Sequence, residues 1–417
     1  MNGQASHNTF YGLGIAPGIL EVINRMKFTI PTPIQHKAIP IGVEGKDVLG
    51  IAQTGTGKTL AFGIPIVQRL AQGPGRALIL VPTRELALQV DETLRKLGQP
   101  FNCRSVILIG GMNMNVQVQV VRKNTTRVLI ATPGRLLDHL QHKTVHLSDM
   151  KVVVVDEADR MLDMGFAPQL QRIAKYLPKE RQTLFFSATM PEAILSMASA
   201  YMKLPIRVEI ARSGSMPEKI AQELFIVRQD HKQKLLASLL KQYTGSVLLF
   251  VRTKAGAKKI TRGLAQTGHR VAEIHSNRSL GQRREALEGF KTGRHRILVA
   301  TDIAARGIDV KGLELVINYD LPDDAENYIH RIGRTGRAGL EGRAISFATP
   351  DQGSDVRGIE RLIKSTLKIA SHPELPAEQF SRYSAPPTSH GPRRPYRPQG
   401  RPGGFSRPQF GFRSKHR

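Results

Sequence analysis

The sequence contains little cysteine, little acid and no long apolar stretch. Its one cysteine, Cys103, cannot form an internal disulfide, and one thiolate is too few for a zinc cluster. The longest apolar runs, 77–81 and 247–251, have five residues each, whereas a transmembrane helix needs about 20. The N-terminus lacks the basic flank and apolar stretch of a secretion signal. We therefore expect a cytoplasmic protein with no membrane span and no structural metal.

The scarcity of acid leaves a large positive charge. The chain has 61 Lys and Arg against 34 Asp and Glu, which gives a formal net charge of +27. Residues 379–417 hold eight Arg, one Lys and no acid, so their charge is +9 and 27 − 9 = +18 belongs to the rest. Both parts therefore predict a polyanionic partner such as nucleic acid.

Residues 371–417 have the composition of a disordered tail. Arg-Pro pairs recur, and aromatic residues are scattered among Gly, Ser and Gln. Such a composition buries too little apolar surface to offset the entropy of ordering. Its arginines can meet phosphates and its rings can stack on bases, which favours nonspecific contact with single-stranded RNA. A purely solubilising tail is the alternative.

The remainder of the chain reads as alternating strands and helices. With 40% hydrophobic and 23% charged residues, it can bury a core. Short runs rich in Val and Ile, each followed by a loop and a helical stretch, are typical of strands buried on both faces of a parallel sheet. They fall in two series, at residues 47–51, 77–81, 105–109, 128–131, 151–155 and 183–186, and then at 223–227, 246–251, 270–274, 296–300, 314–318 and 343–348.

The Ser, Gly and Pro residues of 211–217 mark a linker between the two series. The sequence thus predicts two α/β domains, residues 1–210 and 218–370, followed by the tail 371–417. Helices are expected as crossovers, for example over 134–141, 168–176 and 324–332.

A phosphate-binding loop follows the first predicted strand. Glycines let backbone N–H groups approach phosphate oxygens, a lysine reaches the β and γ phosphates, and a hydroxyl at the next position ligates Mg²⁺. Ala52 stands where the usual pattern has Gly, and a glycine-rich turn without function is the alternative. The strand-to-helix position favours a loop that binds ATP and Mg²⁺ through Thr54, Gly55, Thr56, Gly57, Lys58 and Thr59.

Three acids follow the strand at 151–155, in the sequence Asp156-Glu157-Ala158-Asp159. In a protein with a phosphate loop, a carboxylate at this position holds Mg²⁺ and a second one polarises the attacking water. We assign these roles to Asp156 and Glu157. A solvated helix N-terminus is the alternative, since carboxylates suit the helix dipole.

Taken together, the motifs resemble those of the DEAD-box ATP-dependent RNA helicases of superfamily two, and most of all the bacterial RhlE-type branch. The resemblance runs from Phe10 to about Ala348. It implies two tandem RecA-like domains, each a mainly parallel sheet flanked by helices. It rests on the order and spacing of segments 31–35, 52–59, 82–87, 110–111, 132–135, 156–159, 187–189, 250–253, 301–309 and 330–337.

The resemblance also implies roles for individual residues. Lys58, Asp156, Glu157 and two arginine fingers, Arg334 and Arg337, would carry hydrolysis. The nucleotide would further contact Phe10, Phe28, Gln35, Gly307 and Asp309, and Ser187, Thr189 and His330 would couple the two sites. RNA would be held by its backbone at Arg84, Gly111, Thr132 and Arg135 of the first domain and at Arg252, Arg283 and Thr301 of the second.

Three positions depart from the family pattern. Lys27 stands where Gly is usual, which puts adenine affinity in doubt, and Ser276 and Leu280 replace the common Gly and Gln. The prediction is an RNA-dependent ATPase that binds RNA single strands and short duplexes. It would unwind duplexes locally or remodel RNA–protein complexes. An ATP-gated RNA clamp with little unwinding, a scaffold with a vestigial ATP site and a DNA translocase are the alternatives.

Overall fold

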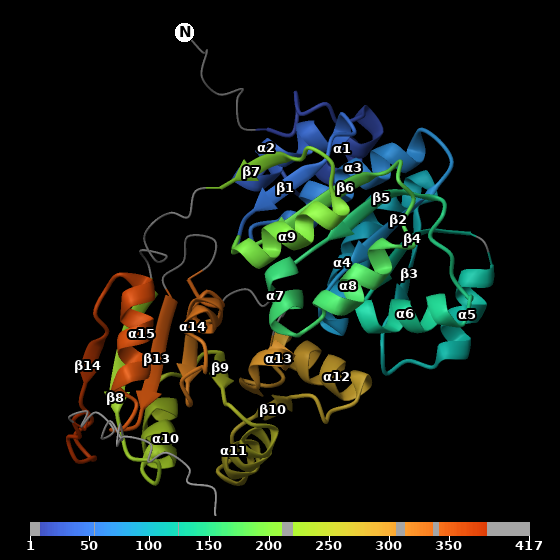
Figure 1. Ribbon diagram of the computed structural model, residues 1–417. Coiled ribbons are helices and arrows are strands. Elements are labelled where there is room, and N and C mark those ends of the chain that lie inside the picture. Colours follow the sequence, from blue (N-terminus) through green and yellow to red (C-terminus); the bar gives the residue numbers. More distant parts are fainter. Residues whose placement is uncertain are drawn as a thin grey trace, which may run out of the picture. The chain divides into compact units, whose positions relative to one another are not determined.

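Figure 1 shows the computed structural model of the chain. It describes residues 9–53, 55–123, 125–210, 220–305, 313–336 and 342–381, with the side chains of Ile303 and Ala305 excepted. The predicted linker 211–217 and residues 382–417 of the predicted tail lie outside these ranges. We call the described residues up to 210 the first lobe and those from 220 onward the second lobe.

The first lobe is built on a parallel sheet of seven strands in the order β3-β4-β2-β5-β6-β1-β7. Its strand pairs run parallel throughout, as in Val48↔Leu184 between β1 and β6. The strands are β1 (Val48–Ile51), β2 (Arg76–Leu80), β3 (Arg104–Leu108), β4 (Thr126–Ala131), β5 (Met150–Val155), β6 (Gln182–Ser187) and β7 (Ile206–Glu209).

The second lobe repeats this topology. Its seven strands follow the order β10-β11-β9-β12-β13-β8-β14, again in parallel pairs. Numbered from the first strand of each lobe, both sheets have the order 3-4-2-5-6-1-7, so each strand has a counterpart at the same place in the other lobe. The strands are β8 (Ile220–Ile226), β9 (Val247–Phe250), β10 (Val271–Ile274), β11 (Ile297–Ala300), β12 (Leu315–Asn318), β13 (Gly342–Ala348) and β14 (Lys368–Ala370).

Helices connect the strands as crossovers (Figure 1). The first lobe has α1 (Pro17–Arg25), α2 (Pro33–Val43), α3 (Lys58–Ala71), α4 (Arg84–Gly98), α5 (Met114–Arg122), α6 (Pro133–Gln141), α7 (Ala158–Asp163), α8 (Ala167–Ala174) and α9 (Glu192–Tyr201). The second lobe has α10 (Lys232–Gln242), α11 (Lys254–Gln266), α12 (Leu280–Lys291), α13 (Asp302–Ala305), α14 (Ala325–Ile332) and α15 (Gly353–Ile363).

Alternate residues of each strand pack on opposite faces of its sheet. In β2, Ala77 and Ile79 face the core beneath α1 to α4, whereas Leu78 and Leu80 face the core beneath α6, α8 and α9. The central strands are therefore buried and mostly apolar, as expected for a sheet covered by helices on both faces. The second lobe follows the same rule, with α10 and α11 on one face and α12 to α15 on the other.

The architecture confirms the predicted fold class, two tandem RecA-like α/β units. The edge strands β7 and β14 were not predicted, because most of their residues are exposed and lack an apolar run. The predicted start of the tail also differs from the structure. Residues 371–381 are described, and Leu375 and Phe380 pack against the cores of the second lobe. No helix within the described residues combines the length and apolar character that a membrane crossing requires.

Candidate functional site

The phosphate loop joins β1 to α3, and its backbone conformation depends on glycine. Gly55 and Gly57 both have φ of +85°, which side chains rarely tolerate. Lys58 is the first residue of α3, and its side chain is buried. Its Nζ donates a hydrogen bond to the carbonyl of Ala52 at 3.2 Å and lies 3.7 Å from Oδ1 of Asp156. The loop therefore presents a buried cation at a helix N-terminus, a suitable arrangement for phosphate.

Gln35 ties α2 to this loop. Its Nε2 donates to the carbonyl of Gly57 at 2.9 Å, and its Oε1 accepts from the backbone N–H of Thr32 at 2.9 Å. A Cβ on Gly57 would collide with the Gln35 amide. The buried Gln35 thus fixes the phosphate loop directly, a role beyond the adenine contact that the resemblance implies.

Phe10 and Phe28, two of the predicted nucleotide contacts, lie before and after α1 in the chain. Phe28 is 39% exposed, as a stacking platform requires, whereas Phe10 is buried in the core. Lys27 has φ of +63°. It donates its backbone N–H to Asn24 at 2.9 Å, and Phe28 donates to Ile23 at 3.2 Å, which together form the Schellman ending of a helix. The conformation of Lys27 therefore explains why glycine is usual at this position, and it also places Phe28.

Asp156 and Glu157 follow β5 directly and are both buried. Burial raises the pKa of Asp156 to about 6; the charge of Lys58 opposes this shift and that of Glu157 adds to it. Glu157 has a left-handed backbone, with φ of +54°, and donates its N–H to Oδ1 of Asp156 at 2.9 Å. A non-glycine residue in this conformation costs about 1–3 kcal/mol, and such strain is found most often at functional sites.

Asp159 connects these carboxylates to the end of β6. Its Oδ2 accepts from the backbone N–H groups of Ala188 at 3.0 Å and Thr189 at 3.1 Å, and from the Thr189 hydroxyl at 3.4 Å. Ser187, the last residue of β6, pairs with Ile51 of β1 beside the phosphate loop. Predicted coupling residues 187 and 189 thus lie between the carboxylate-bearing segment 156–159 and the phosphate loop.

The predicted RNA residues of the first lobe gather at the other half of the same sheet edge. Arg84 begins α4 after β2, and its guanidinium lies against the backbone of Gly111, where a Cβ would collide with it. Thr132 follows β4 and donates its N–H to Leu108 of β3 at 3.1 Å. Nη1 of Arg135 donates to the carbonyl of Met112 at 3.0 Å.

Strand order explains this separation. The phosphate loop follows β1, the candidate catalytic carboxylates follow β5, and the coupling candidates lie at the end of β6, and these three strands are neighbours. RNA candidates follow β2, β3 and β4, which are also neighbours. In open parallel sheets, ligands bind at the carboxyl ends of the strands. The first lobe therefore offers two adjoining sites at one edge, joined where β5 meets β2.

The second lobe places its RNA candidates after the counterpart strands. Arg252 follows β9, Thr301 follows β11, and Arg283 lies in the first turn of α12, which follows β10. The Arg252 side chain is 45% exposed, so a strand of nucleic acid can reach it. Of the departures from the family pattern, Ser276 lies in the turn before α12. Leu280 is the first residue of α12 and directly follows the capping residue Ser279.

α14 and the turn after it carry His330 and Arg334, and Arg334 donates through Nε to the His330 carbonyl at 3.2 Å. Arg331 on the same helix is fully buried. It forms two hydrogen bonds to the Asp302 carboxylate, at 2.6 and 2.7 Å, and lies over the Phe250 ring at 5.0 Å. Thr54, Gly307, Asp309 and Arg337 lie outside the described residues.

Sequence reasoning missed several of these partners. Asp159, Asp302 and Arg331 lie inside the family motifs, but a motif does not say which of its side chains faces inward. Gln117 and His139 have no motif signal. They form a buried chain in which His139 contacts Gln117 at 3.3 Å and Gln117 donates to the carbonyls of Ile109 at 3.1 Å and Met112 at 3.4 Å.

Two family models match the chain. A DEAD/DEAH box helicase model covers residues 32–197, and a helicase conserved C-terminal domain model covers residues 231–339. The chain is 42% identical over 353 residues to the ATP-dependent rRNA helicase RRP3 of Meyerozyma guilliermondii, covering 84% of this chain and 74% of the relative. It is 40% identical over 383 residues to the DEAD-box ATP-dependent RNA helicase RhpA of Helicobacter pylori, covering 91% and 78%.

Solved structures also match the chain over most of its length. S. cerevisiae Dbp5 bound to RNA and ADP BeF3 matches with a TM-score of 0.77 and 32% identity, covering 87% of this chain and 95% of that one. Mss116p bound to ssRNA and AMP-PNP matches with a TM-score of 0.81 and 28% identity, covering 89% and 81%. The chain belongs to the DEAD-box family of ATP-dependent RNA helicases.

Proposed function

We propose that this protein hydrolyses ATP in an RNA-dependent reaction and uses it to part short RNA duplexes locally. The observation that carries the proposal is the pair of adjoining sites at one edge of the first lobe's sheet, which meet where β5 lies beside β2. A change at the carboxylates after β5 would also be transmitted to the end of β6 through the hydrogen bonds of Asp159 to Ala188 and Thr189, because a buried hydrogen-bonded carboxylate is costly to release.

The nucleotide is proposed to bind with its phosphates at the N-terminus of α3. Lys58 would neutralise them, and Gln35 would hold the loop in its binding conformation. The donor set fits Mg²⁺, since Asp156 is a buried carboxylate whose raised pKa a nearby cation would reverse. Thr59 and Asp156 would hold the ion, which supplies charge stabilisation at the phosphates when bound.

Glu157 is proposed to accept a proton from the attacking water. It lies next to Asp156 in a strained, buried turn that restricts its movement. Arg334 and Arg337 are proposed to reach the γ phosphate from the second lobe. An arginine supplied in this way contributes about 10³–10⁵ in rate, so hydrolysis would require both lobes.

RNA is proposed to lie along the β2, β3 and β4 ends of the first lobe and their counterparts in the second. Backbone contacts position a strand without reading its sequence, and the 2′-hydroxyl distinguishes RNA from DNA. Dbp5 bound to RNA and Mss116p bound to ssRNA, each with a nucleotide analogue, support RNA as the ligand. RNA and nucleotide would then strengthen each other's binding by the same factor.

Finer assignments are also proposals. Yeast and bacterial relatives match at 40 to 44% identity, and the motif resemblance favours the bacterial RhlE-type branch. We propose a cytoplasmic location, domain limits near 210 and 218, and ribonucleoprotein partners recruited by the basic tail.

The decisive experiment compares ATP hydrolysis and strand separation for matched RNA and DNA duplexes, short and long. We expect stimulation by RNA and separation of short RNA duplexes alone. The Glu157→Gln variant should hold ATP and RNA together without turnover, because it keeps the binding groups but lacks the base. Hydrolysis without strand separation would favour the ATP-gated clamp, and equal stimulation by DNA would favour the translocase. Normal phosphate release from Glu157→Gln would remove Glu157 from its role.

A further inference from the structure

Because the two lobes share one strand order, equivalent positions can be compared. In the first lobe, Lys58 begins the helix after the first strand, and Asp156 follows the fifth strand. In the second lobe, Lys232 begins α10, the helix after β8, and Asp320 lies two residues beyond the end of β12, the fifth strand. Each lobe therefore brings a lysine and an aspartate together at the same point of the sheet edge.

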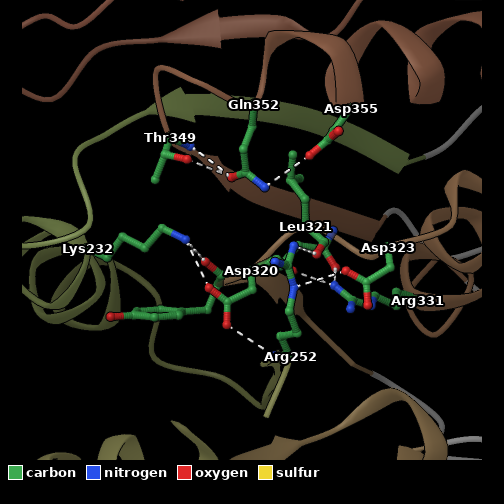
Figure 2. A network of polar contacts seen from close by, with 11 residues as sticks. Lys232, Arg252, Asp320, Leu321, Asp323, Arg331, Thr349, Gln352 and Asp355 are labelled. Carbon is green, nitrogen blue, oxygen red and sulfur yellow. Dashed lines mark hydrogen bonds and ion pairs between the residues drawn. The ribbon is translucent and has the colours of Figure 1, made fainter. Parts of the chain in front are cut away.

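The second pair is built differently from the first. Residues 227–231, which connect β8 to α10, contain no glycine, so their backbone cannot wrap phosphate as the first loop does. The Lys232 side chain is 2% exposed. Its Nζ donates to the Tyr319 carbonyl at 2.8 Å and to Oδ1 of Asp320 at 3.0 Å (Figure 2). The protein thus satisfies this lysine internally.

Asp320 uses its second oxygen on the RNA candidate Arg252. Its Oδ2 accepts the backbone N–H of Arg252 at 3.1 Å, as Figure 2 shows. Nη2 of Arg252 donates to the Leu321 carbonyl at 3.2 Å, and its Nε lies 3.2 Å from Oδ1 of the exposed Asp323. The backbone of Arg252 is therefore fixed from within, while its guanidinium stays at the surface.

Asp320 also contacts α14. The carbonyl of Asp320 accepts Nη1 of Arg331 at 2.6 Å. Arg331 also holds Asp302, which follows Thr301. Arg252 and Asp320 border a cavity of about 890 Å³ at the ends of β8, β9, β12 and β13, so the loop after β9 has open space on one side.

We propose that Lys232 and Asp320 form a positioning pair for Arg252. Lys232 orients the Asp320 carboxylate, and the carboxylate holds the loop after β9 so that the Arg252 guanidinium points at an RNA phosphate. The inference rests on the proposed function, which makes Arg252 an RNA contact. The position that serves nucleotide in the first lobe would thus serve RNA in the second.

Two double substitutions separate the effect of the oxygen that accepts the Arg252 N–H from the effect of the Lys232–Asp320 ion pair. Lys232→Met with Asp320→Asn removes both charges but leaves an oxygen for the Arg252 N–H. Lys232→Met with Asp320→Ala removes both charges and the oxygen. Because both variants lack the buried ion pair, they differ at the hydrogen bond to Arg252. Chemical denaturation establishes that each is folded, and RNA-stimulated ATPase gives kcat and the RNA concentration at half-saturation.

We expect the alanine pair to raise the RNA half-saturation concentration about 3- to 10-fold, the range of one hydrogen bond, with kcat unchanged. The asparagine pair should restore part of the affinity, because the acceptor for the Arg252 N–H remains but Lys232 no longer orients it. The salt slope of RNA affinity should fall by about 0.7, the share of one phosphate contact to a single strand. Adding the alanine pair to Arg252→Ala should cause no further loss, because coupled residues are not additive.

Unchanged RNA half-saturation in the alanine pair would overturn the proposal, and so would equal losses in both pairs, which would assign the effect to the ion pair. Losses that add to that of Arg252→Ala would do the same. Failure of the proposed RNA contact is distinguishable. In that case Arg252→Ala alone would leave RNA affinity unchanged, whatever the paired variants do.

Discussion

At the residue scale, Lys27 adopts a left-handed backbone conformation that is less strained for glycine. It occupies the position after the cap of α1, with φ of +63°, and its hydrogen bonds set the direction of Phe28. A left-handed conformation costs a residue with a Cβ about 1–2 kcal/mol. Glycine would avoid this cost, but its greater backbone freedom would stabilise the unfolded state by about 0.5–1 kcal/mol.

We therefore predict that Lys27→Gly raises the free energy of unfolding by about 0.5–1 kcal/mol, the difference between these effects. Urea denaturation measures the change. Lys27→Ala is the matched control, because it removes the charge but keeps the strain, and it should bring no gain. An equal gain from alanine would show that charge, and not backbone, is responsible.

Asp156 and Glu157 show what a motif does and does not predict at this scale. The tetrapeptide and its place after a strand predict a role in Mg²⁺ binding for Asp156 and a role in activating water for Glu157. The left-handed backbone of Glu157 and the bonds of Asp159 to Ala188 and Thr189 depend on side chains from β6, which no local pattern contains.

At the element scale, a buried polar chain joins α5, α6 and the Gly110–Gly111 turn. His139 on α6 is fully buried between Thr144 at 2.8 Å and Gln117 at 3.3 Å. Burial, with the nearby charge of Arg135, lowers the pKa of His139 to about 4. The turn that carries Gly111 is therefore held by a histidine that is neutral in the folded state.

This shift predicts a pH dependence of stability. Between pH 6.5 and 4, the unfolded chain binds a proton at His139 and the folded protein does not, so stability is full above pH 6.5 and is lost as the pH falls. At pH 5 the loss is about 2 kcal/mol, at 1.36 kcal/mol per pKa unit. His139→Gln should lack this part of the decline.

The measurement compares urea unfolding of both proteins at pH 7 and pH 5. Other groups titrate alike in the two proteins, so the difference between the two declines isolates His139. Parallel declines would mean that His139 titrates normally in the folded protein.

Elements were predictable to different degrees for a physical reason. Strands of the sheet centre are buried and mostly apolar, and they were found within three residues of their bounds. Edge strands β7 and β14 are exposed, and their residues carry no such signal. Lys232 and Asp320 are 88 residues apart and meet only because β8 and β12 end at the same edge.

At the scale of the whole molecule, positive charge is divided between the lobes and residues 382–417, which contain eight Arg, one Lys and no acid. Each phosphate contact to a single strand contributes about 0.7 to the slope of log affinity against log salt. If three or more of these cations meet RNA, their removal should lower the slope by about 2 or more.

The test keeps the chain length constant. Replacing the eight arginines of 382–417 by glutamine should lower the salt slope of RNA affinity and raise the RNA half-saturation concentration, while kcat at saturating RNA stays unchanged because the ATP site is intact. Replacing them by lysine keeps the charge and should preserve the slope. An unaltered slope in the glutamine protein would assign RNA affinity to the two lobes and leave these residues a solubilising role.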